Sequence, residues 1–295
     1  TWPMLWSIRV SVMNKFLRTS FIGRLLRQPS GLIGLVLVLV YLIIALFAVK
    51  ISPYSPLAQH PVDMLQAPNS HYWLGTDEFG RDILSRLMRG ATNSLRVAIF
   101  AVVLAGGVGS VLGIVAAYYG GWWDNVIMRV MDLLFAFPAL LLALAIAAAL
   151  GPGAINTILA IAVVYLPIFA RVGRGSVLGI KELEYVDAAR TIGASHSQII
   201  WRHILPNALA PTIVQTSLAL SWAMLTEASL SFLGLGTMPP QPSWGSMLND
   251  GRTLMELAPW LVIAPGLALL LGVLGFNLLG DGLRDALDPR LNVSK

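Results

Sequence analysis

Long apolar runs are the feature that most constrains how this chain can fold. A helix needs about 20 apolar residues to cross the hydrocarbon layer of a membrane. Six stretches reach that length, at approximately 31–51, 92–118, 126–150, 154–175, 207–230 and 259–280. The runs are continuous and do not alternate apolar with polar residues, which argues against the shorter strands of a membrane barrel. The sequence therefore predicts an all-α integral membrane protein with six transmembrane helices.

The charge content agrees with a membrane location. Only 12% of the residues are charged and 56% are hydrophobic, with a mean hydropathy of +0.73. A soluble domain carries roughly 25% charged residues. The first apolar run begins near Gly31, after a basic stretch, and no small-residue cleavage pattern follows it. We therefore expect a retained span and not a cleaved signal peptide.

The basic residues predict how the spans are oriented. Fourteen of the 20 Lys and Arg residues lie in inside segments when the N-terminus is placed inside. This bias predicts that both termini are cytoplasmic. The expected organisation is an N-terminal cytoplasmic segment 1–30, a transmembrane domain 31–291 containing an inner loop 176–206, and a tail 292–295. The arginine cluster from Arg81 to Arg96 falls on the outer side, where we expect an amphipathic segment at the interface.

Small residues recur along the second apolar run. Ala105, Gly109, Gly113 and Ala117 are spaced four apart. Small side chains let helices approach closely in lipid, where hydrophobic drive between helices is weak. The stripe indicates ordinary helix packing, or a surface on which helices slide during gating.

The inner loop 176–206, named the knob below, has the pattern of two short helices. Gly193 ends the first helix, which contains Asp187, and Ser195 caps the second, which runs to Leu205. Pro206 is expected to end that second helix and to start the next span. One face of the second helix gathers Ile199, Ile200 and Ile204. The sequence therefore predicts a compact cytoplasmic protrusion with a surface for a partner protein.

At these residues the knob resembles the EAA loop of bacterial ABC importer permeases. That pattern reads EAA, three residues, Gly, nine residues and I-x-L-P. The matching positions are Asp187, Ala188, Ala189, Gly193, Leu205 and Pro206. Asp187 stands where Glu is usual, and His203 occupies the usual Ile position.

Other segments resemble the dipeptide/oligopeptide/nickel permease family, its C-type subunit in particular. They read LGTDEFGRDILSRLMRGATNSL, YYGGWWDNVIMRVMD, EASLSFLGLG, PSWGSML and FNLLGDGLRDALDPRL, and the likeness runs from about Gly31 to Leu291. The resemblance implies a type I ABC importer permease fold in the bacterial inner membrane. It implies that the chain forms half of a translocation pathway for peptides or related small solutes.

The same resemblance implies partners and a role for the knob. The partners are a homologous permease, two cytoplasmic ATPase subunits that use ATP and Mg, and an extracytoplasmic solute-binding protein. The knob between the fourth and fifth spans would be a coupling helix seated in a groove of an ATPase. To the matching positions we add Arg190 and Arg202 as charges at the rim of that groove.

The fifth apolar run predicts part of the solute pathway. Its polar and small residues fall on one helix face, and an ionisable Glu227 at membrane depth usually faces water or a partner. The candidate pathway residues are Thr212, Gln215, Thr216, Ala219, Trp222, Thr226 and Glu227. The alternative is that these polar groups bond to a neighbouring subunit, and that Trp222 faces lipid.

Two smaller expectations concern the loops. The outer connection from Phe232 to Pro259 is rich in proline and glycine, and we expect it to contact a solute-binding protein; the alternative is that Trp244 is an interfacial anchor. Asp132 lies three residues from Arg129, and we expect the two to pair.

Catalytic motifs are missing from the sequence. There is no GxxxxGK[ST] phosphate loop and no HExxH, and the chain has no cysteine. We therefore predict no catalytic residue, no metal site and no cofactor in this chain. The rival hypotheses are a self-sufficient secondary transporter or channel, which would need coupling-ion ligands and broken helices at the midplane, and a membrane enzyme.

Overall fold

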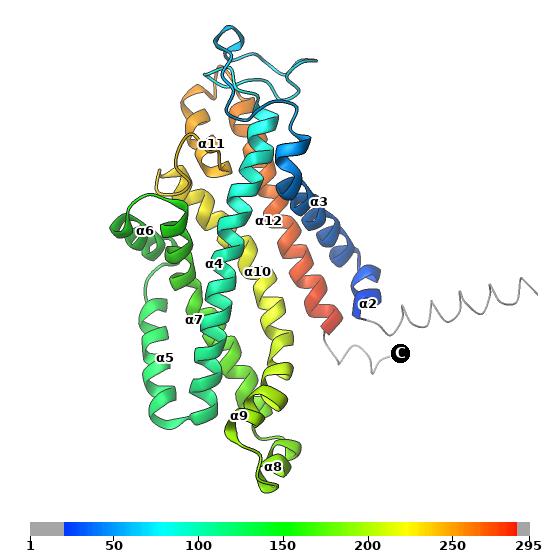
Figure 1. Cartoon of the computed structure of the whole chain (residues 1–295), viewed down its shortest axis with the longest axis vertical. Coiled ribbons are helices and arrows are strands. Elements are labelled where there is room, and N and C mark those ends of the chain that lie inside the picture. Colours follow the sequence, from blue (N-terminus) through cyan, green and yellow to red (C-terminus); the bar gives the residue numbers. More distant parts are fainter. Residues whose placement is uncertain (1–20, 288–295) are drawn as a thin grey trace, which may run out of the picture.

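The computed structural model describes residues 21–287, and every regular element within them is a helix (Figure 1). The longer helices are α2 (Phe21–Arg27), α3 (Pro29–Ile51), α4 (Ile83–Tyr119), α5 (Gly121–Phe135), α6 (Ala139–Leu150), α7 (Ala154–Ile180), α8 (Glu184–Thr191), α10 (Leu205–Phe232), α11 (Trp244–Gly251) and α12 (Trp260–Leu287). Short turns are η1 (Pro61–Asp63), α9 (His196–Ile199), the π-helical η2 (Ile200–Ile204) and η3 (Arg252–Leu254). The expectations for residues 1–20 and 288–295 lie outside the described part.

The described chain contains five helices that are long and apolar enough to span a membrane, or six if the bent pair α5 and α6 counts as one. These are α3, α4, α7, α12 and one helix that runs without a break from His196 to Phe232. The long helices lie side by side, with α8 and α9 at one end of the bundle and residues 52–82 with α11 at the other (Figure 1). The bundle therefore has a knob end and an opposite end, which we call the cap end.

Helix α4 begins earlier than the apolar run predicts. Its N-cap is Asp82, whose side chain accepts a hydrogen bond from the Ser85 amide at 2.8 Å. Arg86 is therefore part of the spanning helix, and its side chain is buried. The expected separate amphipathic segment is wrong, because these residues belong to one helix whose N-cap and buried ion pairs hold Arg81 and Arg86 against the bundle. Arg96, further along the same helix, is exposed.

The third predicted span, 126–150, is not one straight helix. Helices α5 and α6 meet at a bend of 92°. Pro138 lies at the bend, and proline disfavours helical backbone at the residue before it and supplies no amide hydrogen. The continuous apolar run hid this break because hydropathy alone does not register a single proline.

The stripe of small residues on α4 packs against α7. Ala105 and Ala117 are fully buried. A methyl group at Gly109 would lie 2.6 Å from the Leu166 carbonyl oxygen of α7, so only glycine allows this approach. The stripe is therefore a helix-packing surface, the first of the two expected alternatives.

Helix α11 is inserted into the cap end of the bundle through Trp244. The Trp244 side chain is 1% exposed, and its indole nitrogen donates to the Leu87 carbonyl of α4 at 3.1 Å. The ring also meets Tyr41 of α3 edge to face, with 5.5 Å between ring centroids. Trp244 therefore joins three helices, and the alternative that it is an interfacial anchor is wrong.

Candidate coupling site and translocation surface

The knob has the two-helix form that its sequence predicts. Helix α8 ends at Thr191, and Gly193 has a φ of +85°, the left-handed conformation that glycine adopts without strain. Ser195 then forms a capping box with Gln198: its hydroxyl accepts from the Gln198 amide at 3.3 Å, while the Gln198 side chain accepts from the Ser195 amide at 2.9 Å. The glycine stop and the serine cap are both confirmed.

The second half of the knob differs from the expectation at Pro206. The helix does not end there but continues into α10 through the π-turn η2, where the Leu205 amide donates to the Ile200 carbonyl five residues back. Proline lacks an amide hydrogen and clashes with the carbonyl four residues before it, and a π-turn widens the helix at that point. The second helix of the knob and α10 therefore form one continuous helix.

Apolar residues and three polar contacts fix the knob to the spans. Ile199 and Ile204 are buried in a cluster with Ile114 of α4 and Val177 of α7. At the end of α4, the Tyr118 hydroxyl lies 2.7 Å from Nδ1 of His196. The Lys181 ammonium donates to the Ala117 carbonyl at 3.2 Å, and the Asn207 side chain of α10 donates to the Tyr185 hydroxyl of α8 at 3.3 Å. A displacement of the knob must therefore move α4, α7 and α10 with it.

The outer surface of the knob carries residues that the sequence reasoning missed. The expected apolar contacts, Ile199 and Ile204, turn toward the chain's own bundle. Ile192 is instead 86% exposed and Trp201 68% exposed. The two-residue step from Ile199 puts Trp201 on the opposite side of a helix, but its three-residue spacing from Ile204 predicts a shared face. The π-helical turn η2 separates Trp201 from Ile204, and that turn was not predicted.

The residues proposed for ATPase coupling are mostly at the surface. Asp187, Ala188, Arg190, Gly193, Arg202 and Pro206 are exposed, Leu205 is half-buried, and Ala189 is buried. Arg190 pairs with Asp187 at 3.0 Å across one turn of α8. Apart from Leu205 and Ala189, these positions form an accessible surface around the helix stop.

The proposed pathway residues on α10 do not share one open face. Thr212 and Thr216 line a cavity of about 320 Å³ between α4 and α10, together with Ser110 of α4. Both threonine hydroxyls donate to carbonyls one turn back, at 2.9 and 2.8 Å. Gln215 is half-buried, Ala219 is buried and Trp222 is 60% exposed. Apart from Trp222, only the knob-side half of the predicted face is open.

The cap-side half of that face is internal because α4, α7 and α11 pack around α10. Thr226 lies 3.1 Å from the Tyr165 hydroxyl of α7. Glu227 is fully buried, and its Oε1 accepts from the Ser231 hydroxyl at 2.7 Å. Within residues 21–287 its Oε2 has no hydrogen-bond partner. The expectation that Glu227 faces water is therefore wrong for this conformation.

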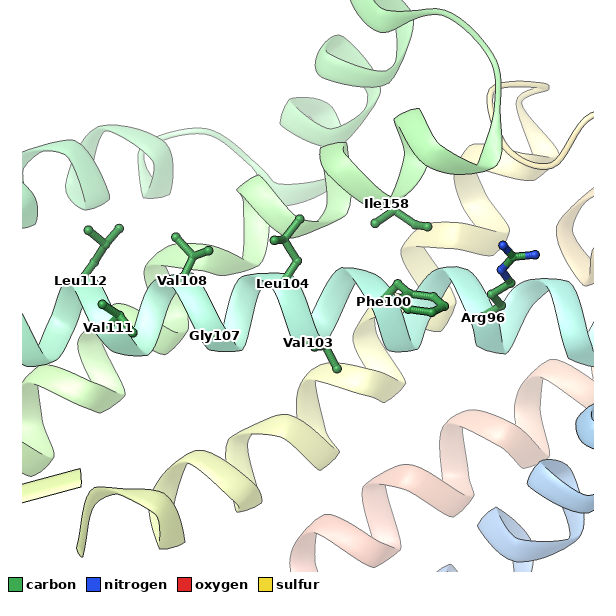
Figure 2. A pocket seen from close by; sticks show the side chains of 9 residues that line it. All are labelled: Arg96, Phe100, Val103, Leu104, Gly107, Val108, Val111, Leu112 and Ile158. Carbon is green, nitrogen blue, oxygen red and sulfur yellow. The ribbon is translucent and has the colours of Figure 1, made fainter. Parts of the chain in front are cut away.

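An apolar cavity on α4 was not foreseen from the sequence (Figure 2). It has a volume of about 890 Å³ and is lined by one face of α4 and by Ile158 of α7. The α4 side chains follow a spacing of three and four residues: Arg96, Phe100, Val103, Leu104, Val108, Val111 and Leu112. Phe100, Val103 and Val111 are 55%, 61% and 58% exposed. The helix thus packs with its small stripe and leaves a larger apolar face open.

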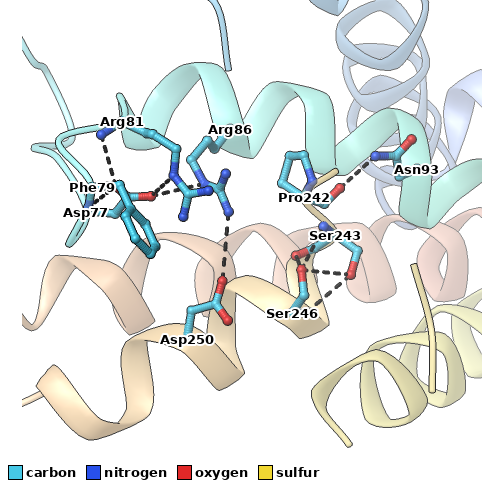
Figure 3. Close-up of polar contacts among 9 residues, drawn as sticks. All are labelled: Asp77, Phe79, Arg81, Arg86, Asn93, Pro242, Ser243, Ser246 and Asp250. Carbon is cyan, nitrogen blue, oxygen red and sulfur yellow. Dashed lines mark hydrogen bonds and ion pairs between the residues drawn. The ribbon is translucent and has the colours of Figure 1, made fainter. Parts of the chain in front are cut away.

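At the cap end, buried ion pairs join α4 to the residues just before it, and a longer pair with an exposed partner reaches α11 (Figure 3). Asp77 accepts from Arg81 at 2.6 Å and lies 3.3 Å from Arg86, whose other end reaches Asp250 of α11 at 3.8 Å. Burial and the nearby Asp250 and Asp77 carboxylates raise the pKa of Glu78. Burial also raises the pKa of Asp250, against the opposing effect of Arg86. The cap end therefore contains charged groups, but Asp77, Arg81 and Arg86 are largely buried from solvent.

Two further ion pairs join α5 to α7. Arg174 donates to both carboxylate oxygens of Asp124, each at 2.7 Å, and Arg171 donates to Asp132 at 2.8 Å. The predicted pairing of Asp132 with Arg129 is wrong, because the approach of α7 brings a better-placed arginine to Asp132. No group of three metal-binding side chains occurs in residues 21–287.

Comparisons with known proteins place the chain among membrane transport subunits. Residues 109–293 match the family described as "Binding-protein-dependent transport system inner membrane component", and residues 17–68 match "N-terminal TM domain of oligopeptide transport permease C". The chain is 46% identical over 268 residues to the dipeptide transport system permease protein DppC of Alkalihalophilus pseudofirmus, covering 91% of this chain and 88% of that protein.

A second relative is also a transport permease, and a solved transporter structure has a similar fold. The chain is 45% identical over 284 residues to the glutathione transport system permease protein GsiD of Pectobacterium atrosepticum, covering 95% of this chain and 94% of the relative. A chain in the inward-facing MetNI methionine ABC transporter superposes with a TM-score of 0.58 at 18% identity, over 69% of this chain and 97% of that one. This last likeness concerns the fold alone.

Proposed function

Because the chain belongs to the family of binding-protein-dependent transport system inner membrane components, we propose that its knob is the site through which a separate ATPase drives it. The chain is a multi-pass inner-membrane permease subunit of an ABC importer, and it does no catalysis itself. Such a system works with an ATPase and a solute-binding protein as separate partners.

The observation that carries this proposal is the continuity of the knob with the spans. Exposed Ile192 and Trp201 supply apolar contacts for a partner groove, and Arg190 and Arg202 lie beside them as rim charges. The buried side of the knob is packed on α4 and α7, and its second helix runs on into α10. A nucleotide-bound partner that binds the knob differently in two states would shift the bundle between two conformations.

The proposed assembly contains one homologous permease, two ATPase subunits and one solute-binding protein. The open apolar face of α4 and the cavity lined by Ser110, Thr212 and Thr216 form this chain's half of the pathway. The buried Ser110 hydroxyl has no hydrogen-bond partner in residues 21–287, so opening of this cavity would offer an unpaired hydroxyl to a passing solute or water. The loop from Phe232 to Pro259 belongs to the cap end, where the binding protein would dock.

The proposed orientation puts both termini and the knob in the cytoplasm and the cap end outside, in line with the Lys and Arg bias. The proposed solutes are short peptides. Relatives of nearly equal length are named for dipeptide and glutathione transport, and both solute classes are small peptides with free charged groups.

Membership of this family argues against the rival hypothesis of a self-sufficient secondary transporter or channel. The bent pair α5 and α6 is the only broken long helix within residues 21–287, whereas midplane ion sites in such transporters are typically built from paired broken helices.

The test is purification with candidate ATPases and the companion permease, followed by assays in lipid vesicles. We expect ATP hydrolysis that is stimulated by a binding protein loaded with a dipeptide or glutathione, and uptake that requires ATP. Uptake by the chain alone on an ion gradient would refute the coupling proposal. ATP-driven uptake of an unrelated solute would refute the solute class only.

A further inference from the structure

A polar cavity between α5 and α7 is not used by the proposed pathway. It has a volume of about 540 Å³ and lies toward the knob end of both helices. Its charged and amide side chains are Asp124, Asn125, Arg129, Asp132, Arg171 and Arg174. A hollow with three guanidinium groups on a membrane helix pair is uncommon, since charged groups at such depth usually face a polar ligand or water.

The charges in this cavity do not cancel. Arg174 is engaged by both oxygens of Asp124, and one Nη of Arg171 binds Asp132. Arg129 is exposed, and its side chain has no ion pair or hydrogen bond within residues 21–287. One positive charge is therefore left over, and Arg171 keeps further donors free. The surplus favours an anion.

The position of the cavity indicates a lipid as the source of that anion. Trp122 and Trp123 begin α5 and are 67% and 51% exposed, as expected of residues at a membrane–water interface. Further along α5, Val126, Val130 and Leu133 are 40%, 48% and 62% exposed. A headgroup in the cavity would leave its acyl chains against this apolar face.

We propose that the α5–α7 cavity binds the phosphate of one anionic phospholipid, with Arg129 as the free charge and Arg171 as a second donor. Basic pockets between spans on the cytoplasmic side are suited to such headgroups. The lipid would come from the inner leaflet, a placement that rests on the proposed orientation. It would brace the bent span α5–α6 against α7, and through α7 it would affect the knob.

The test uses the whole transporter, purified with its partners and exchanged into nanodiscs of phosphatidylcholine with or without phosphatidylglycerol. Native mass spectrometry then counts the phosphatidylglycerol molecules retained after lipid stripping. Arg129→Gln should lower the affinity for one retained molecule about fivefold, the effect of one basic group near a lipid surface. Arg129→Lys should keep most of it. The matched control Arg27→Gln removes an exposed charge from α2 and should change nothing.

Each alternative has its own outcome. Equal retention in wild type and Arg129→Gln would overturn the proposal. A second outcome is that millimolar inorganic phosphate displaces the retained phosphatidylglycerol as readily as that lipid binds. This result would indicate a free-anion site and overturn the lipid assignment. A change in the KM for peptide uptake, with retention unaltered, would make the cavity part of the solute pathway. None of these results depends on whether the knob binds an ATPase.

Discussion

At the scale of single residues, Gly193 is the most constrained position of the knob. Its φ of +85° disfavours any residue with a side chain, although a Cβ there would meet no atom within 4 Å. The strain is therefore conformational and not a clash. This distinction matters because a substitution at Gly193 should distort the knob without disturbing the buried packing beneath it.

Gly193→Val should uncouple ATP hydrolysis from uptake while insertion into the membrane stays intact. A β-branched residue in this conformation costs of order 1–3 kcal/mol, and the knob can relieve the strain by moving its exposed surface. The measurement is the ratio of solute transported to ATP hydrolysed in vesicles. Gly193→Asn is the control, because Asn tolerates this conformation better, and its ratio should stay near that of the wild type. Normal coupling in Gly193→Val would count against the role of the knob.

Glu227 shows where residue-level reasoning from the sequence reached its limit. An ionisable residue at membrane depth suggested a solute contact, but the side chain is fully buried between helices. No period or composition rule tells a buried carboxyl from one that lines a water-filled path. The contact with Ser231 instead makes it a packing and hydrogen-bonding group.

Glu227→Gln should therefore be nearly neutral, and Glu227→Ala should destabilise the protein by roughly 2 kcal/mol. Gln keeps the carbonyl oxygen that accepts from Ser231 and fills the same volume, whereas Ala leaves a cavity and a buried hydroxyl with a lost partner. Thermal unfolding in detergent measures the difference. A large loss of uptake in Glu227→Gln with unchanged stability would restore the pathway hypothesis for this residue.

At the scale of elements, the sequence located the apolar runs but not their breaks. The helix stop at Gly193 and the cap at Ser195 follow from local backbone chemistry, so they were predictable. Proline has opposite effects at two positions: the chain bends at Pro138, whereas the helix continues through Pro206 after a π-turn. Tertiary packing decides between them, since only the second proline is held in line by a buried cluster beside it.

The Asp124–Arg174 pair is the clearest link between α5 and α7. Arg174→Gln leaves Asp124 without its two hydrogen bonds, and we expect a loss of about 1–2 kcal/mol, because the pair is bidentate but only partly buried. The double variant Asp124→Arg with Arg174→Asp should recover part of this loss. A double-mutant cycle on thermal unfolding gives the coupling energy, and a value of zero would show that the pair does not brace the two helices.

The cap junction predicts a pH dependence. The pKa of Glu78 is raised in the folded protein above an ordinary value of 4.5, so its ionised form is disfavoured there. Glu78 therefore opposes folding above the raised pKa and has no effect below about 4.5. Glu78→Gln should stabilise the protein at pH 7 to 8, by less than about 1 kcal/mol because solvent screens the site, and the gain should vanish on acidification. The measurement compares the unfolding midpoints of Glu78→Gln and wild type from pH 8 down to acidic pH. An equal gain in stability at every pH would exclude the carboxyl charge as its cause.

At the scale of the whole molecule, sequence reasoning reached the family and the helical membrane fold, and the comparisons agree with both. The motifs were sufficient to identify the family because their order and spacing can be read directly from the sequence. The open face of α4 and the α5–α7 cavity were not found, because they arise from how helices distant in sequence leave space between them. Such surfaces matter most in an assembly, where a single chain supplies only part of each site.

The chain's lack of cysteine permits a direct test of the central claim, that the knob meets an ATPase on the cytoplasmic side. Ser197→Cys places one thiol on the exposed face of the knob, and Val62→Cys places one at the cap end, where Val62 is 95% exposed. The measurement is labelling by a membrane-impermeant maleimide, in intact spheroplasts and in inverted vesicles, with and without co-expressed ATPase subunits.

If the knob meets an ATPase in the cytoplasm, Ser197→Cys is labelled only in inverted vesicles and is protected there when the ATPase subunits are present. Val62→Cys should show the reverse sidedness and no protection. Labelling of Ser197→Cys in intact spheroplasts, or equal labelling with and without the ATPase, would contradict it.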